Sequence, residues 1–417
     1  MRAAVAHLIP APFTQQVARA LEERDSLAAL FCTFVDQPEA SWQQAACLAA
    51  SLAGIDLRSD LRRRAITEVP PARVRSYPRR ELLRMAQVRL LNNPVLGDRV
   101  FHWGRDGFEA CVARHLKGLD LIYAYEYGAL RIFREARSLG IRTIYDLPSP
   151  EHDFVERLLA PEFSKFPELV TPYRQHTLAL HEERTQRRRQ EWELADLVIA
   201  NSSFTAGSWQ AAGWSARRLE VVPYGAPPPI ATASDGPPIR PVRLLWAGTF
   251  SIRKGAHLLL ESVRLLAVSP ADLVIDVFGA QGLPASLLET APANVVFHGS
   301  IPRAELLERM RQAHALIFPT LCDGFGLVVN EAFSQGLPVI TTKRAGAADL
   351  VQPSENGLLI DAGSTEAIAA VIDQVLKDPD KVNDLRPAAL ATAAQWQWAD
   401  YRQRIGELLL EPWPASA

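Results

Sequence analysis

The chain has 417 residues, 48% of them hydrophobic and 22% charged, which is enough for two or three domains that each have a core. Its formal net charge of -2 argues against bulk electrostatic binding of nucleic acid. The cysteines Cys32, Cys47, Cys111 and Cys322 form no Cys-x-x-Cys pair, so we expect neither a zinc site nor a disulfide framework. No segment reaches the roughly 20 apolar residues that span a bilayer, and residues 1–10 lack a secretory cleavage pattern. We therefore expect a cytoplasmic protein, either soluble or peripheral at the inner face of the cell membrane.

Apolar runs of strand length alternate with helical patterns along most of the chain, which predicts a parallel α/β architecture. The stretch from Pro223 to Pro241 is rich in proline and has no apolar periodicity, which predicts a linker. Before this linker the predicted strands are residues 3–9, 27–35, 119–125, 142–146, 197–200 and 219–222, with long helices over 154–195. After it the predicted strands are residues 242–247, 273–278, 295–297, 315–318, 338–341 and 357–360, and the predicted helices are 254–267, 303–313, 365–376 and 391–410.

This pattern predicts two doubly wound domains, an N-terminal one over residues 1–225 and a C-terminal one over residues 242–395, joined by a linker at 226–241. Ligands of such parallel sheets bind at the carboxyl ends of the strands. We therefore expect the functional site to lie in a cleft between the two domains.

The most informative segment runs from Pro319 to Ile340 and has the pattern of a strand end, a glycine loop, a helix, a turn and a strand. A glycine loop that opens a helix presents free backbone N–H groups and the positive end of the helix dipole, which favours a phosphate. Asp323 and Glu331 bracket this loop with seven residues between them. Carboxylates on both sides of a phosphate suit a sugar nucleotide, in which a sugar and a ribose flank the pyrophosphate.

A second informative segment follows the predicted strand 242–247 and contains Gly248, Thr249, Arg253 and Lys254. Two cations at the carboxyl end of a strand neutralise a diphosphate that leaves during a transfer reaction. The alternative is an ordinary basic start of a helix. Cations at a helix N-terminus oppose the helix dipole, which favours the anion-binding interpretation.

Residues 58–89 form a strongly basic segment, in which ten arginines face only three acids, Asp60, Glu68 and Glu81. The arginines are Arg58, Arg62, Arg63, Arg64, Arg73, Arg75, Arg79, Arg80, Arg84 and Arg89. One interpretation is a solvated helical surface. The other is a basic face that contacts anionic lipid headgroups or an anionic acceptor.

The two glycine loops, together with the segment Gly336-Leu337-Pro338-Val339-Ile340, resemble those of the retaining nucleotide-sugar glycosyltransferases of the bacterial group 1 family, also called family four. The segments 201–205, 222–225 and 396–401 are similar to that family as well. The resemblance covers residues 194–410 and is loose before residue 190. It implies the GT-B fold, with two Rossmann-like domains that face a cleft and a last helix, residues 396–417, that returns to the first domain.

The resemblance also implies roles for individual residues. Asp323 contacts hydroxyls of the donor sugar, and Glu331 holds the hydroxyls of the ribose. Lys254 and Arg253 stabilise the diphosphate as it leaves. The other implied donor contacts are Gly248, Thr249, Ile301 beside the nucleobase, and the backbone N–H groups around Gly326, Leu327 and Val328.

This chain departs from the family pattern at two positions. Asp323 stands where the family more often has Glu, and Thr249 stands where it usually has Arg. Arg253, next to Lys254, supplies the missing charge in this interpretation. In the N-terminal domain His152 follows a predicted strand end and is the candidate histidine near the transferred sugar, although a lone loop histidine is as often structural.

The function implied by the resemblance is retaining transfer of a sugar from a nucleotide diphosphate sugar to a glycan or lipid-linked acceptor, in polysaccharide or glycolipid biosynthesis. In this fold the reaction is expected to need no metal and no further cofactor. The alternative is a non-catalytic member that binds a nucleotide sugar or serves as a scaffold. An epimerase on the same fold is disfavoured, because residues 323–331 follow the transferase pattern.

Overall fold

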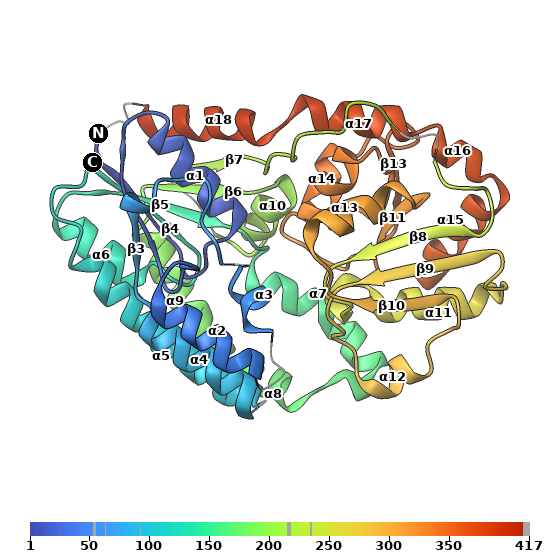
Figure 1. Cartoon of the computed structure of the whole chain (residues 1–417), viewed down its shortest axis with the longest axis horizontal. Helices are drawn as coiled ribbons and strands as arrows, with labels where there is room; N and C mark the ends of the chain where they lie inside the picture. Colours follow the sequence, from blue (N-terminus) through green and yellow to red (C-terminus); the bar gives the residue numbers. More distant parts are fainter. Residues whose placement is uncertain (53–55, 63, 92, 215–217, 234–235, 412–417) are drawn as a thin grey trace.

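The computed structural model describes residues 1–52, 56–62, 64–91, 93–214, 218–233 and 236–411. They form two α/β units that lie side by side, each built around one parallel sheet (Figure 1). Residues Arg63 and 412–417, for which the sequence predicts a basic surface and a helix end, lie outside the described part.

A seven-stranded sheet forms the first unit, in the order β3-β2-β1-β4-β5-β6-β7. In its centre Val5 pairs in parallel with Leu30 on one side and Tyr123 on the other. All four residues of β1 are buried, as expected for a strand that helices cover on both faces. The strands are β1 (Ala3–Ala6), β2 (Leu27–Cys32), β3 (Val74–Ser76), β4 (Leu121–Tyr125), β5 (Arg142–Leu147), β6 (Leu197–Ala200) and β7 (Leu219–Val221).

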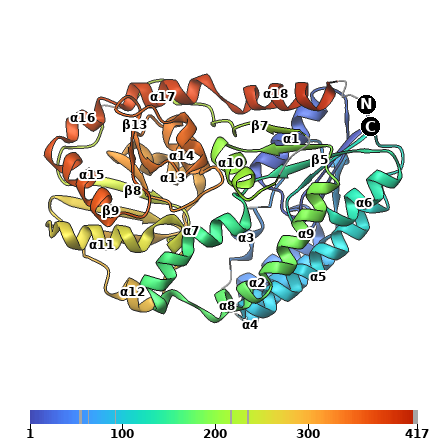
Figure 2. The same cartoon turned by 180° about the vertical axis from the view of Figure 1, so that it is seen from behind.

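Ten α-helices of the described residues accompany this sheet in the sequence. Figure 2 shows α5, α6 and α9 on one side of the unit, where α6 contacts both α5 and α9. None of the described helices in the whole chain is long and apolar enough to cross a bilayer. The ten are α1 (Pro12–Glu22), α2 (Ser41–Leu52), α3 (Leu57–Arg62), α4 (Pro78–Leu91), α5 (Pro94–Ala113), α6 (Leu130–Ser138), α7 (His152–Lys165), α8 (Pro172–Ala179), α9 (His181–Glu193) and α10 (Ser203–Ala211).

The second unit contains a six-stranded parallel sheet in the order β10-β9-β8-β11-β12-β13. Its strands are β8 (Val242–Ala247), β9 (Leu273–Phe278), β10 (Val295–Gly299), β11 (Ala315–Phe318), β12 (Val339–Thr342) and β13 (Gly357–Ile360). The helices that follow β8 in the sequence are α11 (Ala256–Leu266), α12 (Ala285–Glu289), α13 (Arg303–Arg311), α14 (Leu327–Ser334), α15 (Thr365–Lys377), α16 (Pro379–Asn383), α17 (Arg386–Gln395) and α18 (Trp398–Leu410). The two parallel sheets confirm the α/β class expected from the sequence.

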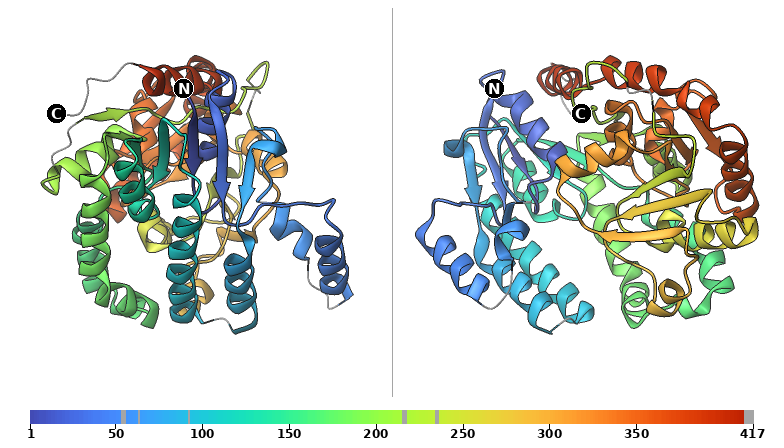
Figure 3. Two further views of the ribbon diagram at one scale, coloured as in Figure 1. Left: turned by 90° about the vertical axis from the view of Figure 1, so that its left-hand side faces the viewer. Right: turned by 45° about the vertical axis from the view of Figure 1, so that its right-hand side comes forward.

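Two helices cross from one unit to the other. The last helix, α18, runs back over the first unit and packs on α1, as Figures 1 and 3 show. Arg402 on α18 donates to Glu23 at 3.0 Å and to Gln16 at 2.8 Å. In the other direction α7 brings Leu159 into the hydrophobic core of the second unit. The returning last helix confirms what the resemblance implies.

Two differences from the prediction concern an edge strand and the last predicted helix. The edge strand β3 was not predicted, because three residues with Arg75 in the middle are too short to show a strand period. The helix predicted over 391–410 is broken between α17 and α18. There the backbone of Ala226 donates to Trp396 at 2.9 Å and accepts from Trp398 at 3.1 Å. These two hydrogen bonds keep the backbone out of helical geometry between α17 and α18, where the chain passes Ala226.

Candidate functional site

The glycine loop of the second unit has the geometry of an anion site. β11 ends at Phe318 and α14 begins at Leu327, so residues 319–326 form the predicted loop. Gly326 has a φ of 88°, and a Cβ there would lie 2.9 Å from the ring of Phe318, so glycine is required. Among the described residues no side chain caps α14. The first N–H groups of this helix, at Leu327 and Val328, are therefore available to a phosphate, and the helix dipole favours its charge.

Lys254 and Asp323 form an ion pair across the two glycine loops, although they are 69 residues apart. The ammonium also lies 4.7 Å from the centre of the Phe318 ring. Arg253 joins the same loops, because its Nε donates to the carbonyl of Cys322 at 3.0 Å and its own carbonyl accepts from Leu321 N at 2.9 Å. The structure therefore brings three of the four predicted catalytic residues together at the carboxyl ends of β8 and β11.

The charge state of Lys254 is set by opposing effects. Burial, and then the nearby Arg253 guanidinium, lower the pKa of Lys254 from 10.5 to about 7. The Asp323 carboxylate opposes this shift, because an ion pair favours the charged amine. Without Asp323 the site would hold two adjacent cations and no anion.

Glu331 lies one turn along α14 and faces a pocket of about 570 Å³. Its carboxylate accepts from Arg303 Nε at 2.7 Å, and the Glu331 side chain is 18% exposed. The predicted residues Gly248 and Ile301 line the same pocket, whereas Thr249 does not and lies exposed beside Gly282. Further lining residues that sequence reasoning did not assign are Gly279, Pro302, Leu306 and, from α3 of the first unit, Arg62.

The loop of residues 319–326 also contacts the first unit. The carbonyl of Gly324 accepts from Ser202 Oγ at 2.6 Å and from Thr205 Oγ1 at 3.0 Å. A Cβ on Gly324 would lie 2.1 Å from the carbonyl oxygen of Pro148, in the loop after β5. Sequence reasoning noted residues 201–205 but gave Ser202 and Thr205 no role. The reason is that a serine or threonine at the start of a helix already has a local explanation as a cap.

His152 lies at the start of α7, in the chain segment that follows this contact. Its ring stacks on His181 at 4.5 Å, and its Nε2 is buried without a hydrogen-bond partner among the described residues. Burial, and then the charge of Arg188, lower the pKa of His152 to about 3, so the imidazole is neutral. The neighbouring acids are held elsewhere: Glu151 caps α7 at Phe154 N, and Asp146 accepts from Tyr123. No recorded contact joins His152 to Lys254 or Asp323 among the described residues, so its role stays a prediction.

The chain is similar to known proteins both in sequence and in fold. Residues 234–392 match the family model described as "Glycosyl transferases group 1". The chain is 28% identical over 197 residues to the D-inositol 3-phosphate glycosyltransferase of Arthrobacter sp., covering 45% of this chain and 46% of that protein. It is 27% identical over 243 residues to the GDP-mannose-dependent alpha-(1-6)-phosphatidylinositol monomannoside mannosyltransferase of Mycolicibacterium smegmatis, covering 52% and 62%. The chain thus spans about half the length of the curated relatives it matches.

Solved structures extend the likeness to the whole chain. Sucrose-phosphate synthase from Thermosynechococcus elongatus superposes with a TM-score of 0.66 at 18% identity and covers 98% of both chains. The Anabaena protein HepE in complex with UDP-glucose gives a TM-score of 0.61 at 20% identity and covers 98% of this chain and 99% of that one. At such identities the likeness shows the fold, which is the two-domain GT-B arrangement expected from the sequence.

Proposed function

We propose that this chain, a group 1 glycosyl transferase by its residues 234–392, transfers a sugar from a nucleotide diphosphate sugar to an acceptor hydroxyl. The observation that carries the proposal is the order of groups along one edge of the second sheet. Asp323 with Lys254 lies at one end, the free N–H groups of α14 lie next, and Glu331 with its pocket lies beyond. That order matches the sugar, the diphosphate and the nucleoside of the donor.

Each part of the donor then has a partner. Glu331 accepts the ribose hydroxyls, since a carboxylate takes two hydrogen bonds at once. The backbone beside Ile301 borders the base. The N–H groups of Leu327 and Val328 hold the distal phosphate, and Lys254 leaves Asp323 to join it. Asp323, freed from its ion pair, accepts hydroxyls of the donor sugar.

The reaction proposed is retaining and uses no metal. Bond cleavage between the sugar and the diphosphate leaves negative charge on the phosphate oxygen. Lys254, Arg253 and the N-terminus of α14 stabilise that charge in a partly buried site, where such interactions are strongest. The acceptor hydroxyl attacks from the side on which the diphosphate departs and its proton passes to the leaving diphosphate, so the configuration of the sugar is kept.

The acceptor is proposed to be a glycan or a lipid-linked molecule used in polysaccharide or glycolipid assembly. The two curated relatives reported above have D-inositol 3-phosphate and phosphatidylinositol monomannoside in their names. A peripheral membrane contact is part of this proposal. Support comes from exposed apolar side chains on α2 and α4, beside the arginines of residues 58–89: Trp42, Leu48, Leu52, Leu83, Val88 and Leu91.

A nucleotide and nucleotide-sugar panel tests the proposal directly. We expect one of UDP, GDP or ADP to raise the unfolding temperature, and the matching nucleotide sugar to be hydrolysed or transferred. Glu331→Ala should abolish the thermal shift, and Lys254→Ala should abolish turnover. Absence of both binding and turnover with every donor would refute the proposal. Binding without turnover, unaffected by Lys254→Ala, would instead favour the non-catalytic alternative.

A further inference from the structure

A second pocket, outside the donor site, opens at the carboxyl ends of the first sheet. It has a volume of about 490 Å³ and lies between α4, α5 and the loops that follow β1, β2 and β3. The loop residues that line it include Leu8 after β1, Thr33 after β2 and Tyr77 after β3. Carboxyl ends of parallel strands are where such sheets bind ligands. The place of the pocket in the fold is therefore that of a substrate site in the first unit.

The charge of this pocket is strongly positive. Five guanidinium groups line it but only one carboxylate, Glu81. Glu81 is already shared, since its Oε1 lies 2.8 Å from Arg64 and 2.7 Å from Arg84. Among the described residues no carboxylate pairs with three of the other lining arginines, Arg79, Arg80 and Arg114. The charge that these residues leave uncompensated calls for an anionic ligand.

One of these arginines is buried and incompletely bonded. The side chain of Arg105 is only 6% exposed, and its Nη1 has no hydrogen-bond partner among the described residues. Its Nε and Nη2 both donate to Asp106, at 3.0 and 2.8 Å, and the Asp106 side chain is 58% exposed. The guanidinium also lies 4.6 Å from the centre of the Tyr127 ring and has the Tyr127 side chain as a hydrogen-bond partner. A buried guanidinium N–H without an acceptor is costly unless a ligand supplies one. Arg105 is thus a buried cation whose hydrogen-bonding capacity is only partly used by the described residues.

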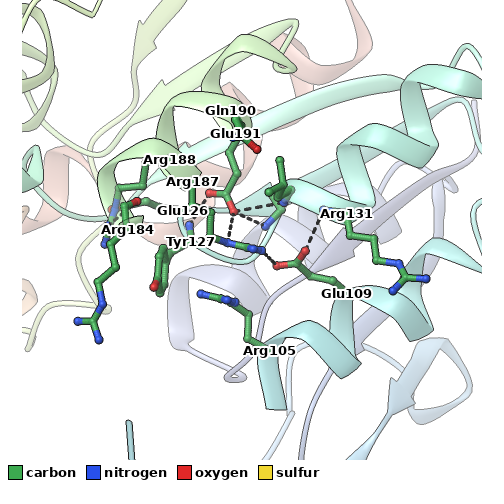
Figure 4. Close-up of polar contacts among 12 residues, drawn as sticks. Arg105, Glu109, Glu126, Tyr127, Arg131, Arg184, Arg187, Arg188, Gln190 and Glu191 are labelled. Atoms are coloured by element: carbon green, nitrogen blue, oxygen red, sulfur yellow. Dashed lines mark hydrogen bonds and ion pairs between the residues drawn. The ribbon is translucent and has the colours of Figure 1, made fainter. Parts of the chain in front are cut away.

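Beside Arg105 lies a network of buried polar contacts (Figure 4). Glu191 is fully buried and accepts from the backbone N–H groups of Tyr127 at 2.8 Å and Ala129 at 3.1 Å. Arg187 contacts both Glu191 and Glu109, and Glu109 accepts from the backbone of Arg131. These bonds fix the turn after β4, and with it the Tyr127 ring on which Arg105 lies. The guanidinium therefore needs little ordering when a ligand arrives.

Arg80 is held in the same way from the other wall. Its guanidinium lies 4.2 Å from the centre of the Trp103 ring, and its Nη1 donates to the Trp103 carbonyl at 2.5 Å. A Cβ on Gly107 would lie 2.2 Å from that Nη1, so glycine on α5 makes the space in which Arg80 lies. The remaining wall is apolar, with the side chains of Leu8, Ile9, Phe101 and Phe108. The pocket thus offers fixed guanidinium groups next to an apolar surface.

We propose that this pocket binds the acceptor, and that the acceptor carries a phosphoryl group beside an apolar portion. Guanidinium groups bind phosphoryl oxygens through paired, charge-assisted hydrogen bonds, which suits Arg105 and Arg80. The apolar wall takes the neighbouring part of the molecule. That the ligand is the acceptor rests on the proposed function, whereas the binding of a phosphoryl group in this pocket does not. A lipid phosphate and a soluble phosphate ester share this chemistry, and the experiment separates them.

Calorimetric titration of the full-length protein with three soluble probes tests the proposal. The probes are dihexanoyl phosphatidic acid, glycerol 3-phosphate and hexyl glucoside, used at one fixed low ionic strength because surface charges are screened by salt. We expect dihexanoyl phosphatidic acid to bind. Glycerol 3-phosphate, which lacks the apolar chains, should bind at least about tenfold more weakly. Hexyl glucoside, which lacks the phosphoryl group, should give no signal. Equal affinity for glycerol 3-phosphate would remove the apolar part of the proposal and indicate a soluble ester. No binding of either phosphate would overturn it.

Arginine variants locate the binding. Arg105→Gln and Arg80→Gln should each weaken binding at least about tenfold, the effect of one charge-assisted hydrogen bond. Arg79→Gln, at an exposed position that folding does not need, should weaken it several-fold. Arg134→Gln is the matched control, because Arg134 is an exposed arginine of the same unit on α6 whose one side-chain partner among the described residues is Gln190. Unchanged affinity in Arg79→Gln and in a folded Arg80→Gln would overturn the proposal.

The donor site supplies the means to separate the two proposals. All four variants should keep the nucleotide affinity of the wild type, since none of these arginines lines the Glu331 pocket. If no nucleotide binds the wild type while dihexanoyl phosphatidic acid does, the proposed function fails and the phosphoryl pocket stands. If nucleotide binds and neither phosphate does, the reverse holds.

Discussion

Replacing Lys254 with Met separates the charge of this residue from its packing. Met keeps an unbranched side chain of similar length beside the Phe318 ring but removes the ammonium, and its sulfur is a favourable neighbour for an aromatic ring. Asp323, whose side chain is only 14% exposed, then loses its counter-ion. An unsatisfied buried polar group costs about 1–3 kcal/mol, and more when charged. We therefore expect the variant to fold but to unfold a few degrees earlier than the wild type.

The activity of Lys254→Met should fall far more than its stability. The removed ammonium faces the oxygen on which charge develops as the diphosphate leaves. Loss of one preorganised donor to such an oxygen lowers kcat by about 10²–10³-fold. Donor turnover measured with the nucleotide sugar identified by the panel, next to calorimetric unfolding, gives both quantities. The Michaelis constant for the donor should change less than kcat, because the stabilisation is greatest in the transition state.

A double variant makes the argument quantitative. In Lys254→Met/Asp323→Asn the neutral amide no longer needs a counter-ion, so the unfolding temperature should recover while turnover stays lost. The coupling free energy of the pair should lie at about 1–3 kcal/mol. Lys377→Met is the control, because Lys377 is 74% exposed and pairs with Asp373 within one helix. If Lys254→Met keeps kcat within a factor of ten, or if the double variant is no more stable than the single one, the assigned role of the ion pair is wrong.

Three further predictions concern Glu331, the contact between the units and a buried carboxyl. Glu331→Gln should raise the Michaelis constant of the donor by about tenfold with kcat little changed, as loss of one charged hydrogen-bond acceptor predicts. Gly324→Ala places a Cβ 2.1 Å from the Pro148 carbonyl, so the loop must move, and both the unfolding temperature and the nucleotide affinity should fall. Burial raises the pKa of Asp146 from 3.8 to about 7, so the folded state binds its proton more tightly than the unfolded state. The free energy of unfolding should therefore decline between about pH 4 and 7, and the decline should be smaller in Asp146→Asn, as urea midpoints will show.

The sequence predicted those parts of the fold that rest on local pattern. Buried parallel strands are continuous apolar runs, so β6, β8, β9, β11 and β13 were predicted with the bounds that the structure has. The glycine loop before α14 was also predictable, because its glycines can be read from the sequence. The structure explains the glycine at Gly326, where a positive φ and a close aromatic ring leave room for no side chain. The edge strand β3 carries no such pattern and was missed.

Contacts between distant segments were beyond the sequence. The ion pair of Lys254 with Asp323 and the bond of Ser202 to the Gly324 carbonyl join residues 69 and 122 positions apart. Neither residue pair is marked by spacing or composition. His152 is the opposite case. Its place after a strand suggested a site residue, but in the structure its ring is largely buried and stacks on His181. What decides each case is the packing of one unit on the other, which no local pattern records.

The arginines of residues 58–89 illustrate how packing divides a uniform sequence feature. The sequence offered a single basic face or a solvated surface, but the structure sends neighbouring arginines to different places. Arg64 and Arg73 form ion pairs with Glu81 and Glu22. Arg62 reaches across to the pocket of Glu331, while Arg79, Arg80 and Arg84 line the pocket of the first sheet. Because Arg62 belongs to the first unit while the rest of the Glu331 pocket belongs to the second, movement of one unit on the other changes the lining of that pocket.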